Sequence, residues 1–294
     1  MVWRWLKCRV ITAQLQKVTS TCKCCQLAEL VVEMRDNDLE EKLQNAMNNG
    51  DNIWVIGDVH GYFNTFQVLV EKLQLKENDI VVMIGDLIDR GPTSAHVVNY
   101  VRTTENFFCI RGNHEQMMIE GFDESEFFIE RNYDSRFWYH NGGRATESSY
   151  VALYSDADTV LSKASDDVNW MKNLPTEIVL DDWRFVHAGY DQNHDVEGQE
   201  EHNHMWLREQ FYTSKKPIDP KRTILFGHTP TLKHLHKDDS KAGLVWFSDV
   251  KLEDGRSMAI GLDTCLYHDF NLPKVLAAYN IQTNKIIYQN RIID

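Results

Sequence analysis

The chain has 294 residues, of which 43% are hydrophobic and 26% are charged, and its formal net charge is −13. This length supports one domain or at most two with a sizeable core, and the acidic balance argues against a nucleic-acid partner recognised through phosphate contacts. No apolar run approaches the roughly 20 residues of a membrane helix, and no secretory signal is recognisable. We therefore expect a cytoplasmic protein without a membrane partner, monomeric or weakly oligomeric.

Residues 1–33 differ from the rest, because five Lys or Arg stand there against two Glu. The segment also holds Cys8, Cys22, Cys24 and Cys25. Thiolates bind zinc, but Cys24 and Cys25 are adjacent and no histidine or second spaced pair follows nearby. We predict an N-terminal extension over residues 1–50, partly disordered or loosely docked, with a short amphipathic helix near residues 38–47. Residues 51–294 form the main domain.

The first half of this domain alternates strands and helices. The predicted strands cover residues 53–56, 80–84 and 107–110. The predicted helices cover residues 64–75, 92–101 and 114–119. This β-α-β-α-β order, with helices long enough for right-handed crossovers, predicts a parallel sheet.

The second half is predicted to begin with helices and to end with strands. Residues 121–173 show no reliable strand pattern and are predicted to be a mostly helical insertion, with a tight loop at residues 141–143. The strands that follow are predicted at residues 178–180, 183–186, 223–226, 258–260, 275–281 and 286–290. Residues 191–204 and 231–243 are predicted to be polar loops.

Polar side chains follow five of the predicted strands. In open α/β sheets, binding sites form at the carboxyl ends of the strands. The residues at these ends are Asp58, His60, Asp86, Asn113, His187 and His228. Such mixed oxygen and nitrogen ligands suit Mn, Fe or Zn better than calcium. The pattern predicts a metal site, and we interpret Asp86 as the carboxylate that bridges two ions.

A single histidine after a strand is more often a core or surface residue than a ligand, so the joint pattern carries this prediction. Of the remaining histidines, only His114 is given a role. The others are predicted to be solvated or are left unexplained, namely His96, His140, His194, His202, His204, His234, His236 and His268. Cys109 and Cys265 are predicted to be packed thiols.

Five motifs, at residues 57–61, 85–91, 112–115, 187–189 and 227–229, resemble in order the signature series of the PPP-type metallophosphoesterases. Residues 52–55, 111–118 and 224–230 are similar, more closely, to the bacteriophage lambda protein phosphatase and related bacterial serine/threonine protein phosphatases. The resemblance extends from about residue 51 to the end. It implies an α/β fold of the calcineurin-like type, a β-sandwich of mixed sheets flanked by helices in four αββα layers.

The resemblance also implies a binuclear centre of two divalent ions, with Mn²⁺ favoured over Fe or Zn. The ligands of the first ion would be Asp58, His60 and Asp86. The ligands of the second ion would be the shared Asp86 with Asn113, His187 and His228. A water that bridges both ions would lose its proton near neutral pH and attack phosphorus in line.

The family further implies roles for residues beside these ligands. His114 would be the general acid, and Asp89 would orient it and keep it protonated. Arg90 and Arg111 would hold the non-bridging phosphate oxygens in forked geometry. Residues 206–208 resemble the family segment that supplies another phosphate-binding arginine, here Arg208.

These features predict a metal-dependent phosphatase for phosphoserine and phosphothreonine in phosphoproteins or phosphopeptides, with activity on phosphotyrosine left open. The alternative within the fold is a dinucleoside tetraphosphate hydrolase. Such relatives tend to lack an acid at the position of Asp89, to carry Asp at Glu115 and to carry an aromatic residue at Thr229. A non-catalytic scaffold is less favoured, because all the ligand positions are filled. Residues 265–270 differ from the small residues that the family has there, so the shape of substrate that fits beside this loop is not predicted.

Overall fold

The computed structural model describes residues 34–123, 137–269 and 271–293. They belong to one compact unit, Met34–Asp294. The four cysteines of the N-terminal segment, and the zinc site considered for them, lie outside the described residues. No helix in the described part of the chain is both long enough and apolar enough to span a membrane.

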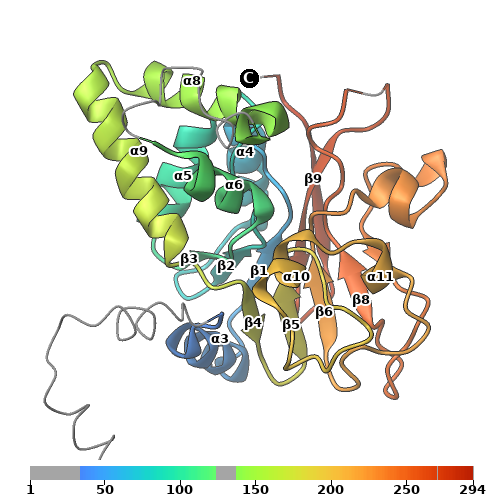
Figure 1. The fold of residues 1–294 in the computed structure, drawn as a ribbon. Coiled ribbons are helices and arrows are strands. Elements are labelled where there is room, and N and C mark those ends of the chain that lie inside the picture. Colours follow the sequence, from blue (N-terminus) through green and yellow to red (C-terminus); the bar gives the residue numbers. More distant parts are fainter. Residues whose placement is uncertain (1–33, 124–136, 270, 294) are drawn as a thin grey trace, which may run out of the picture. The chain divides into compact units, whose positions relative to one another are not determined.

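The first of two central sheets has the strand order β10-β9-β1-β2-β3 (Figure 1). Its strands are β1 (Ile53–Ile56), β2 (Ile80–Met83), β3 (Phe107–Cys109), β9 (Val275–Asn280) and β10 (Ile286–Asn290). The pairs β1–β2 and β2–β3 are parallel, as predicted, and β9 and β10 form the predicted closing hairpin. Helices α4 (Phe63–Leu73) and α5 (Ser94–Thr103) connect the parallel strands.

The second sheet has the order β4-β5-β6-β8-β7. Its strands are β4 (Glu177–Val179), β5 (Trp183–Val186), β6 (Thr223–Phe226), β7 (Trp246–Phe247) and β8 (Ala259–Gly261). The hairpin of β4 and β5 is the predicted one, and β5, β6 and β8 run parallel. Both sheets are therefore mixed, as expected for this fold class.

Side chains of the central strands alternate between two separate cores. Trp54 and Ile56 of β1 pack against the helices, whereas Ile53 and Val55 pack against the second sheet. A strand that is buried on both faces reads as a continuous apolar run, as β1 does. On the outer face of the second sheet, Phe226 packs with Phe211 of the short helix α11 (Glu209–Tyr212). The predicted αββα layering is confirmed.

Helix α3 (Asn37–Asn49) packs on the core between the sheets. Asp36 caps its first turn by accepting a hydrogen bond from the Leu39 N–H at 3.0 Å. Gly50 ends it in the left-handed conformation with φ 81°. Leu43 is fully buried. The compact unit thus begins before the predicted domain boundary at residue 51.

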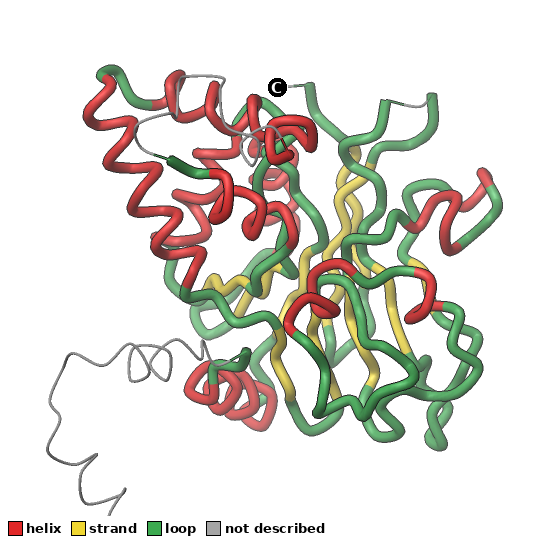
Figure 2. Tube along the Cα trace, in the orientation of Figure 1, coloured by secondary structure: helices red, strands yellow, loops and turns green. Residues whose placement is uncertain are grey.

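The described part of the predicted insertion is helical. It contains the end of α6 (Asn113–Gly121), a wide helical turn over Tyr139–Gly143, α8 (Arg144–Leu153) and α9 (Ala157–Lys172). These helices lie with α4 and α5 on one side of the first sheet, and Figure 2 shows the strands of both sheets beside them. Residues 124–136 of the predicted insertion lie outside the described residues.

Two predicted loops contain short helical segments instead. Helix α10 (Glu201–Trp206) begins in the first of them, and the turns Thr231–Leu235 and Asp239–Lys241 lie in the second. Segments this short show no helical period in sequence and depend on tertiary packing for their stability. The strand β7 was not predicted, because its two residues are too few to show the alternation typical of a strand.

Candidate active site

The predicted metal ligands converge at the carboxyl ends of five strands. Asp58 and His60 follow β1, Asp86 follows β2, and Asn113 begins α6 just after β3. His187 and His228 follow β5 and β6 of the other sheet. All six side chains are buried, with at most 4% exposed. The site therefore takes ligands from both sheets at the same end of the molecule.

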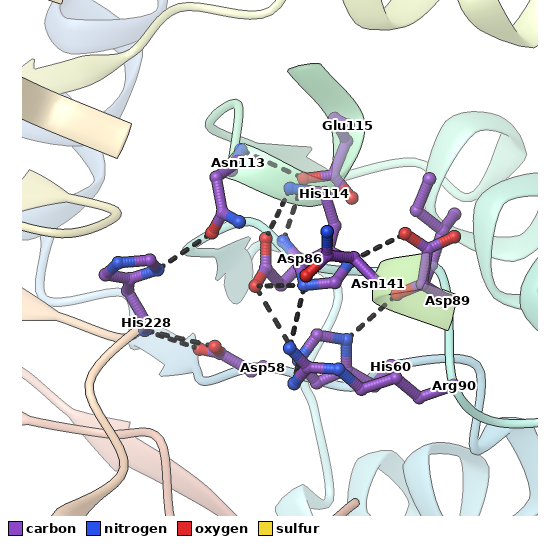
Figure 3. A network of polar contacts seen from close by, with 12 residues as sticks. Asp58, His60, Asp86, Asp89, Arg90, Asn113, His114, Glu115, Asn141 and His228 are labelled. Carbon is purple, nitrogen blue, oxygen red and sulfur yellow. Dashed lines mark hydrogen bonds and ion pairs between the residues drawn. The ribbon is translucent and has the colours of Figure 1, made fainter. Parts of the chain in front are cut away.

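Asp86 lies at the centre of the group (Figure 3). Its Oδ1 is 3.3 Å from Nε2 of His187, and its Oδ2 is 3.6 Å from Nε2 of His60. Two candidate metal groups result, His60–Asp86–His114 and Asp86–His187–His228, and Asp86 belongs to both. A carboxylate with one oxygen toward each group has the geometry of a bridging ligand.

Asn113 completes the second group. Its Oδ1 is 2.9 Å from Nε2 of His187 and 2.8 Å from Nδ1 of His228. An amide oxygen and two imidazole nitrogens thus face one another beside the Asp86 carboxylate. This is the donor set that the sequence predicts for the second ion.

Two backbone carbonyls determine which ring nitrogen of His187 and of His60 is free to bind a metal ion. Nδ1 of His187 lies 2.7 Å from the Ile84 carbonyl, and Nδ1 of His60 lies 2.9 Å from the Ile88 carbonyl. A carbonyl only accepts, so Nδ1 carries the hydrogen and Nε2 presents a lone pair in the neutral ring. Metal-binding histidines are oriented in this way. The residues present fit a pair of divalent ions.

Burial and charge set the protonation of these groups. Burial, reinforced by the charge of Arg90, lowers the pKa of His60 well below its usual range. Burial would raise the pKa of Asp86, but His187 and His114 hold it well below normal. For His187, burial lowers the pKa, but Asp86 more than offsets this and the pKa rises to about 9. A metal ion would therefore displace a proton from Nε2 of His187, and the neutral ring with a free lone pair belongs to the metal-bound state. The central carboxylate is therefore charged and attracts cations.

Asp58 reaches the centre through a close backbone approach. Its carboxylate accepts a hydrogen bond from the His228 N–H at 3.0 Å. A Cβ on Gly227 would lie 2.1 Å from its Oδ1, so only glycine fits there. This contact ties the end of β1 in one sheet to the end of β6 in the other.

His114 and Asp89 form the predicted pair. Nδ1 of His114 lies 2.6 Å from Oδ2 of Asp89, and both side chains are buried. Arg90 lies beside them, with Nη2 2.9 Å from Nε2 of His114 and Nη1 2.8 Å from Nε2 of His60. Arg90 thus bridges the Nε2 atoms of His60 and His114, which both belong to the first candidate metal group.

The other two predicted arginines are placed differently. Arg208 donates from Nη1 to the His228 carbonyl at 2.9 Å, which sets it beside a ligand residue. Arg111 is buried, and its Nη2 lies 3.0 Å from the Glu201 carboxylate of α10. Its Nη1 donates to Gln116 at 3.0 Å. The Arg111 guanidinium is therefore held between α6 and α10 by protein groups.

Glu115 is a site residue to which the sequence analysis gave no structural role. Its Oε2 accepts from the N–H groups of Asp86 at 2.8 Å and Gly112 at 2.9 Å, and its Oε1 accepts from Leu87 at 2.8 Å. The available signal was its position, because a glutamate at the third helical residue commonly reaches back to the helix start.

Three more residues at the site carried no role in the sequence analysis. Trp138 and Thr146 both contact Asp89. Tyr267, from the loop that departs from the family pattern, lies 3.8 Å from the Arg90 guanidinium and packs edge-on to His60. No local motif marks any of them, because each reaches the site through tertiary packing.

One histidine expectation is wrong. His204 was predicted to be solvated or was left unexplained, but it is only 1% exposed. Its Nδ1 lies 3.1 Å from the Thr176 hydroxyl, and its ring packs on Tyr190. His204 lies on the buried face of α10, and the polar residues around it in sequence gave no sign of this burial. Cys109 and Cys265 are buried, as predicted.

A family comparison agrees with this geometry. Residues 52–260 match the calcineurin-like phosphoesterase family. The chain belongs to this family and is a metallophosphoesterase, a hydrolase of phosphate esters that uses divalent metal ions.

Two relatives with different named activities match the chain at similar identity. The chain is 26% identical to serine/threonine-protein phosphatase 1 of Salmonella typhimurium, over 69% of this chain and 88% of that protein. It is 28% identical to the symmetrical bis(5'-nucleosyl)-tetraphosphatase of Erwinia tasmaniensis, over 49% of this chain and 46% of that protein. The predicted relationship to bacterial serine/threonine phosphatases is confirmed.

Among solved structures, one with a provisional assignment as a diadenosine tetraphosphatase superposes with a TM-score of 0.52 at 19% identity. The match covers 83% of this chain and 95% of that one. At this identity the likeness supports the fold.

Proposed function

We propose that the protein is a metal-dependent phosphatase that hydrolyses phosphoserine and phosphothreonine in proteins or peptides. The observation that carries this proposal is the buried pair of His114 and Asp89, with 2.6 Å between Nδ1 and Oδ2. An alkoxide from serine or threonine is a poor leaving group and needs a proton as it departs. A histidine held by a carboxylate is suited to supply that proton.

The chain's own residues would share the remaining work. Arg90 lies between His60 and His114, where a guanidinium fork fits the non-bridging oxygens of a phosphate. We propose Arg208 as a further phosphate contact. We propose Arg111 as well, which would have to exchange its contact with the Glu201 carboxylate for the phosphate. Asp58, His60, Asp86, Asn113, His187 and His228 would hold the two ions, which we propose to be Mn²⁺. When bound, the ions supply an activated water nucleophile and Lewis-acid stabilisation of the phosphoryl oxygens.

The second candidate is a dinucleoside tetraphosphate hydrolase, which the Erwinia tasmaniensis relative favours. Its leaving group would be a nucleotide phosphate. Such a group departs without a proton, so a strongly held general acid has less to contribute there. For this reason we place the dinucleotide activity second.

A direct comparison of substrates tests the proposal. With Mn²⁺ present, kcat/KM should be higher for phosphoserine and phosphothreonine peptides than for diadenosine tetraphosphate. The activity on a phosphotyrosine peptide shows whether the substrate range includes phosphotyrosine. His114→Asn should lower kcat on the phosphopeptides by about 10²–10⁴-fold. The control is His194→Asn, which changes an exposed histidine paired with Asp191. Faster dinucleotide cleavage, or full activity of His114→Asn at saturating Mn²⁺, would overturn it.

A further inference from the structure

The segment from Trp138 to Thr146 packs directly on the loop that carries Asp89 and Arg90. It belongs to the helical insertion and consists of the wide turn Tyr139–Gly143 and the start of α8. Trp138, Thr146 and Asp89 are all buried, each with at most 1% exposed. The segment holds no candidate metal ligand, so the metal centre does not explain these contacts.

Trp138 donates to the Asp89 carboxylate. Its indole Nε1 lies 3.0 Å from Oδ1 and 3.1 Å from Oδ2. The indole N–H is a donor only, so its direction is unambiguous. Because it reaches both oxygens, it fixes the plane of the carboxylate as well as its position.

Thr146 makes a reciprocal pair of hydrogen bonds with the same residue. Its hydroxyl donates to Oδ1 of Asp89 at 2.6 Å and accepts from the Asp89 N–H at 2.9 Å. With Trp138 and Thr146 on Oδ1, the Oδ2 atom remains directed at Nδ1 of His114. A rotation of the Asp89 carboxylate would break these hydrogen bonds together.

The backbone at this point is strained and is held by the same segment. Asp89 and Arg90 are consecutive non-glycine residues in the left-handed region, with φ 73° and φ 70°. Such residues persist only where surrounding contacts impose the conformation. The Arg90 N–H donates to the Gly142 carbonyl at 3.3 Å. Three hydrogen-bond partners from one segment thus constrain two adjacent site residues.

We propose that Trp138 and Thr146 are positioning residues for the pair of Asp89 and His114. They hold the Asp89 carboxylate so that it fixes the His114 ring with Nε2 directed into the site, beside Arg90 and the first candidate metal group, where a substrate oxygen would depart. The proposal rests on the proposed phosphomonoesterase chemistry, in which His114 protonates the leaving group. It assigns a role to the insertion that is separate from metal binding and from substrate contact.

The leaving group provides a readout that a purely structural role would not change. Phenyl phosphate and 4-nitrophenyl phosphate carry the same phosphate on a similar ring, but phenolate is the more basic leaving group and needs the proton more. Trp138→Phe keeps an aromatic ring and removes the donor, and Thr146→Val keeps the shape and removes the hydroxyl. Each should reduce kcat on phenyl phosphate about tenfold more than on 4-nitrophenyl phosphate, with KM little changed.

Two variants serve as controls. Thr146→Ser keeps the hydroxyl. Its ratio of kcat on phenyl phosphate to kcat on 4-nitrophenyl phosphate should stay close to that of the wild type. Tyr150→Phe removes a buried hydrogen bond of the same helix, from the Tyr150 hydroxyl to Asp167 at 2.7 Å, at a site apart from Asp89. It should lower the thermal stability and leave the ratio of the kcat values on the two aryl phosphates unchanged.

A double-mutant cycle completes the test. In a His114→Asn background, measured at raised enzyme concentration, Trp138→Phe should cause no further change, because the residue acts through His114. An equal loss on both aryl esters, or an undiminished further loss in the His114→Asn background, would overturn the inference. Wild-type protein inactive on both esters would overturn it as well. The aryl esters contain neither a peptide nor a nucleotide. Faster cleavage of diadenosine tetraphosphate than of phosphopeptides would therefore overturn the proposed substrate without affecting the result for Trp138 and Thr146.

Discussion

Glu115 links two of the ligand-bearing loops at the scale of single residues. Its carboxylate accepts hydrogen bonds from the backbone N–H groups of Asp86, Leu87 and Gly112. Three ligand residues, His60, Asp86 and His228, adopt the left-handed conformation with φ 47°, 54° and 59°. Each such residue costs about 1–3 kcal/mol and needs its surroundings to hold it. The contacts from Glu115 supply part of that support for Asp86.

His204 should make the stability of the protein depend on pH. Burial, with a contribution from the charge of Arg184, lowers the pKa of His204 from 6.5 to about 4. The unfolded chain takes up this proton below about pH 6.5, whereas the folded chain resists it, so stability is lost as pH falls from about 6.5 to 4. At about 1.4 kcal/mol per pKa unit, this difference is worth roughly 3 kcal/mol.

His204→Phe keeps a ring against Tyr190 and removes the titration. Urea unfolding at about pH 7 and about pH 4.5 should show that the variant loses about 2 kcal/mol less free energy of unfolding than the wild type. Equal losses in the two proteins would contradict the prediction.

At the scale of elements, the wide turn Tyr139–Gly143 determines how the insertion meets the site. Gly142 has φ 114° and interrupts the helical path, and its carbonyl accepts from the Arg90 N–H. A Cβ on Gly142 would lie 2.7 Å from the Arg90 N atom and 2.9 Å from its Cγ. The turn can approach Arg90 this closely only because its residue is glycine.

Gly142→Ala should therefore disturb Arg90 as well as the turn. We expect kcat/KM on a small aryl phosphate to fall roughly ten- to hundredfold, because small displacements at a site are costly. The matched control is Gly255→Ala, where φ is 88° but no atom lies within 4 Å of the new Cβ. Both variants should lose about 1–2 kcal/mol of stability from the left-handed backbone. If Gly255→Ala lost as much activity, the Arg90 contact would not be the cause.

At the scale of the whole molecule, the two sheets and helix α3 share one hydrophobic core. Leu39, Leu43 and Ala46 of α3 lie in the cluster that separates the sheets. Glu40 and Gln44 accept from the N–H groups of Val179 at 2.7 Å and Asp181 at 3.0 Å, beside β4. We propose on this basis that the catalytic domain begins near Met34 and includes α3.

Leu43→Ala tests that proposal in the full chain. Leu43 is 0% exposed, so the substitution should cost about 2–5 kcal/mol of the free energy of unfolding. Leu244 is 43% exposed, and Leu244→Ala should change stability by no more than about 0.5 kcal/mol. Denaturant unfolding measures both. If the two leucines were equivalent, α3 would lie outside the cooperative domain.

The sequence by itself determined the candidate metal ligands, the parallel pairing of the first three strands and the family. Each ligand stands within a few residues of a strand end, and strands of one parallel sheet bring their carboxyl ends to the same edge. Asp58, Asp86 and Asn113 could therefore be placed together from local patterns. His187 and His228 belong to the second sheet. The pattern of strand ends already included them in the metal site, and the family resemblance assigned them to the second ion beside Asp86.

Only the tertiary structure decided which residues surround those ligands. Trp138 and Thr146 lie 49 and 57 residues from Asp89 in sequence, and Glu201 reaches Arg111 from another helix. Such contacts depend on how helices pack on a sheet, and packing leaves no periodic signal at the residues that make the contact. The burial of His204 was hidden for the same reason, since polar neighbours in sequence do not reveal an apolar environment in space. The apolar face of α3 was visible in the sequence, but only the structure showed that this face packs between the two sheets.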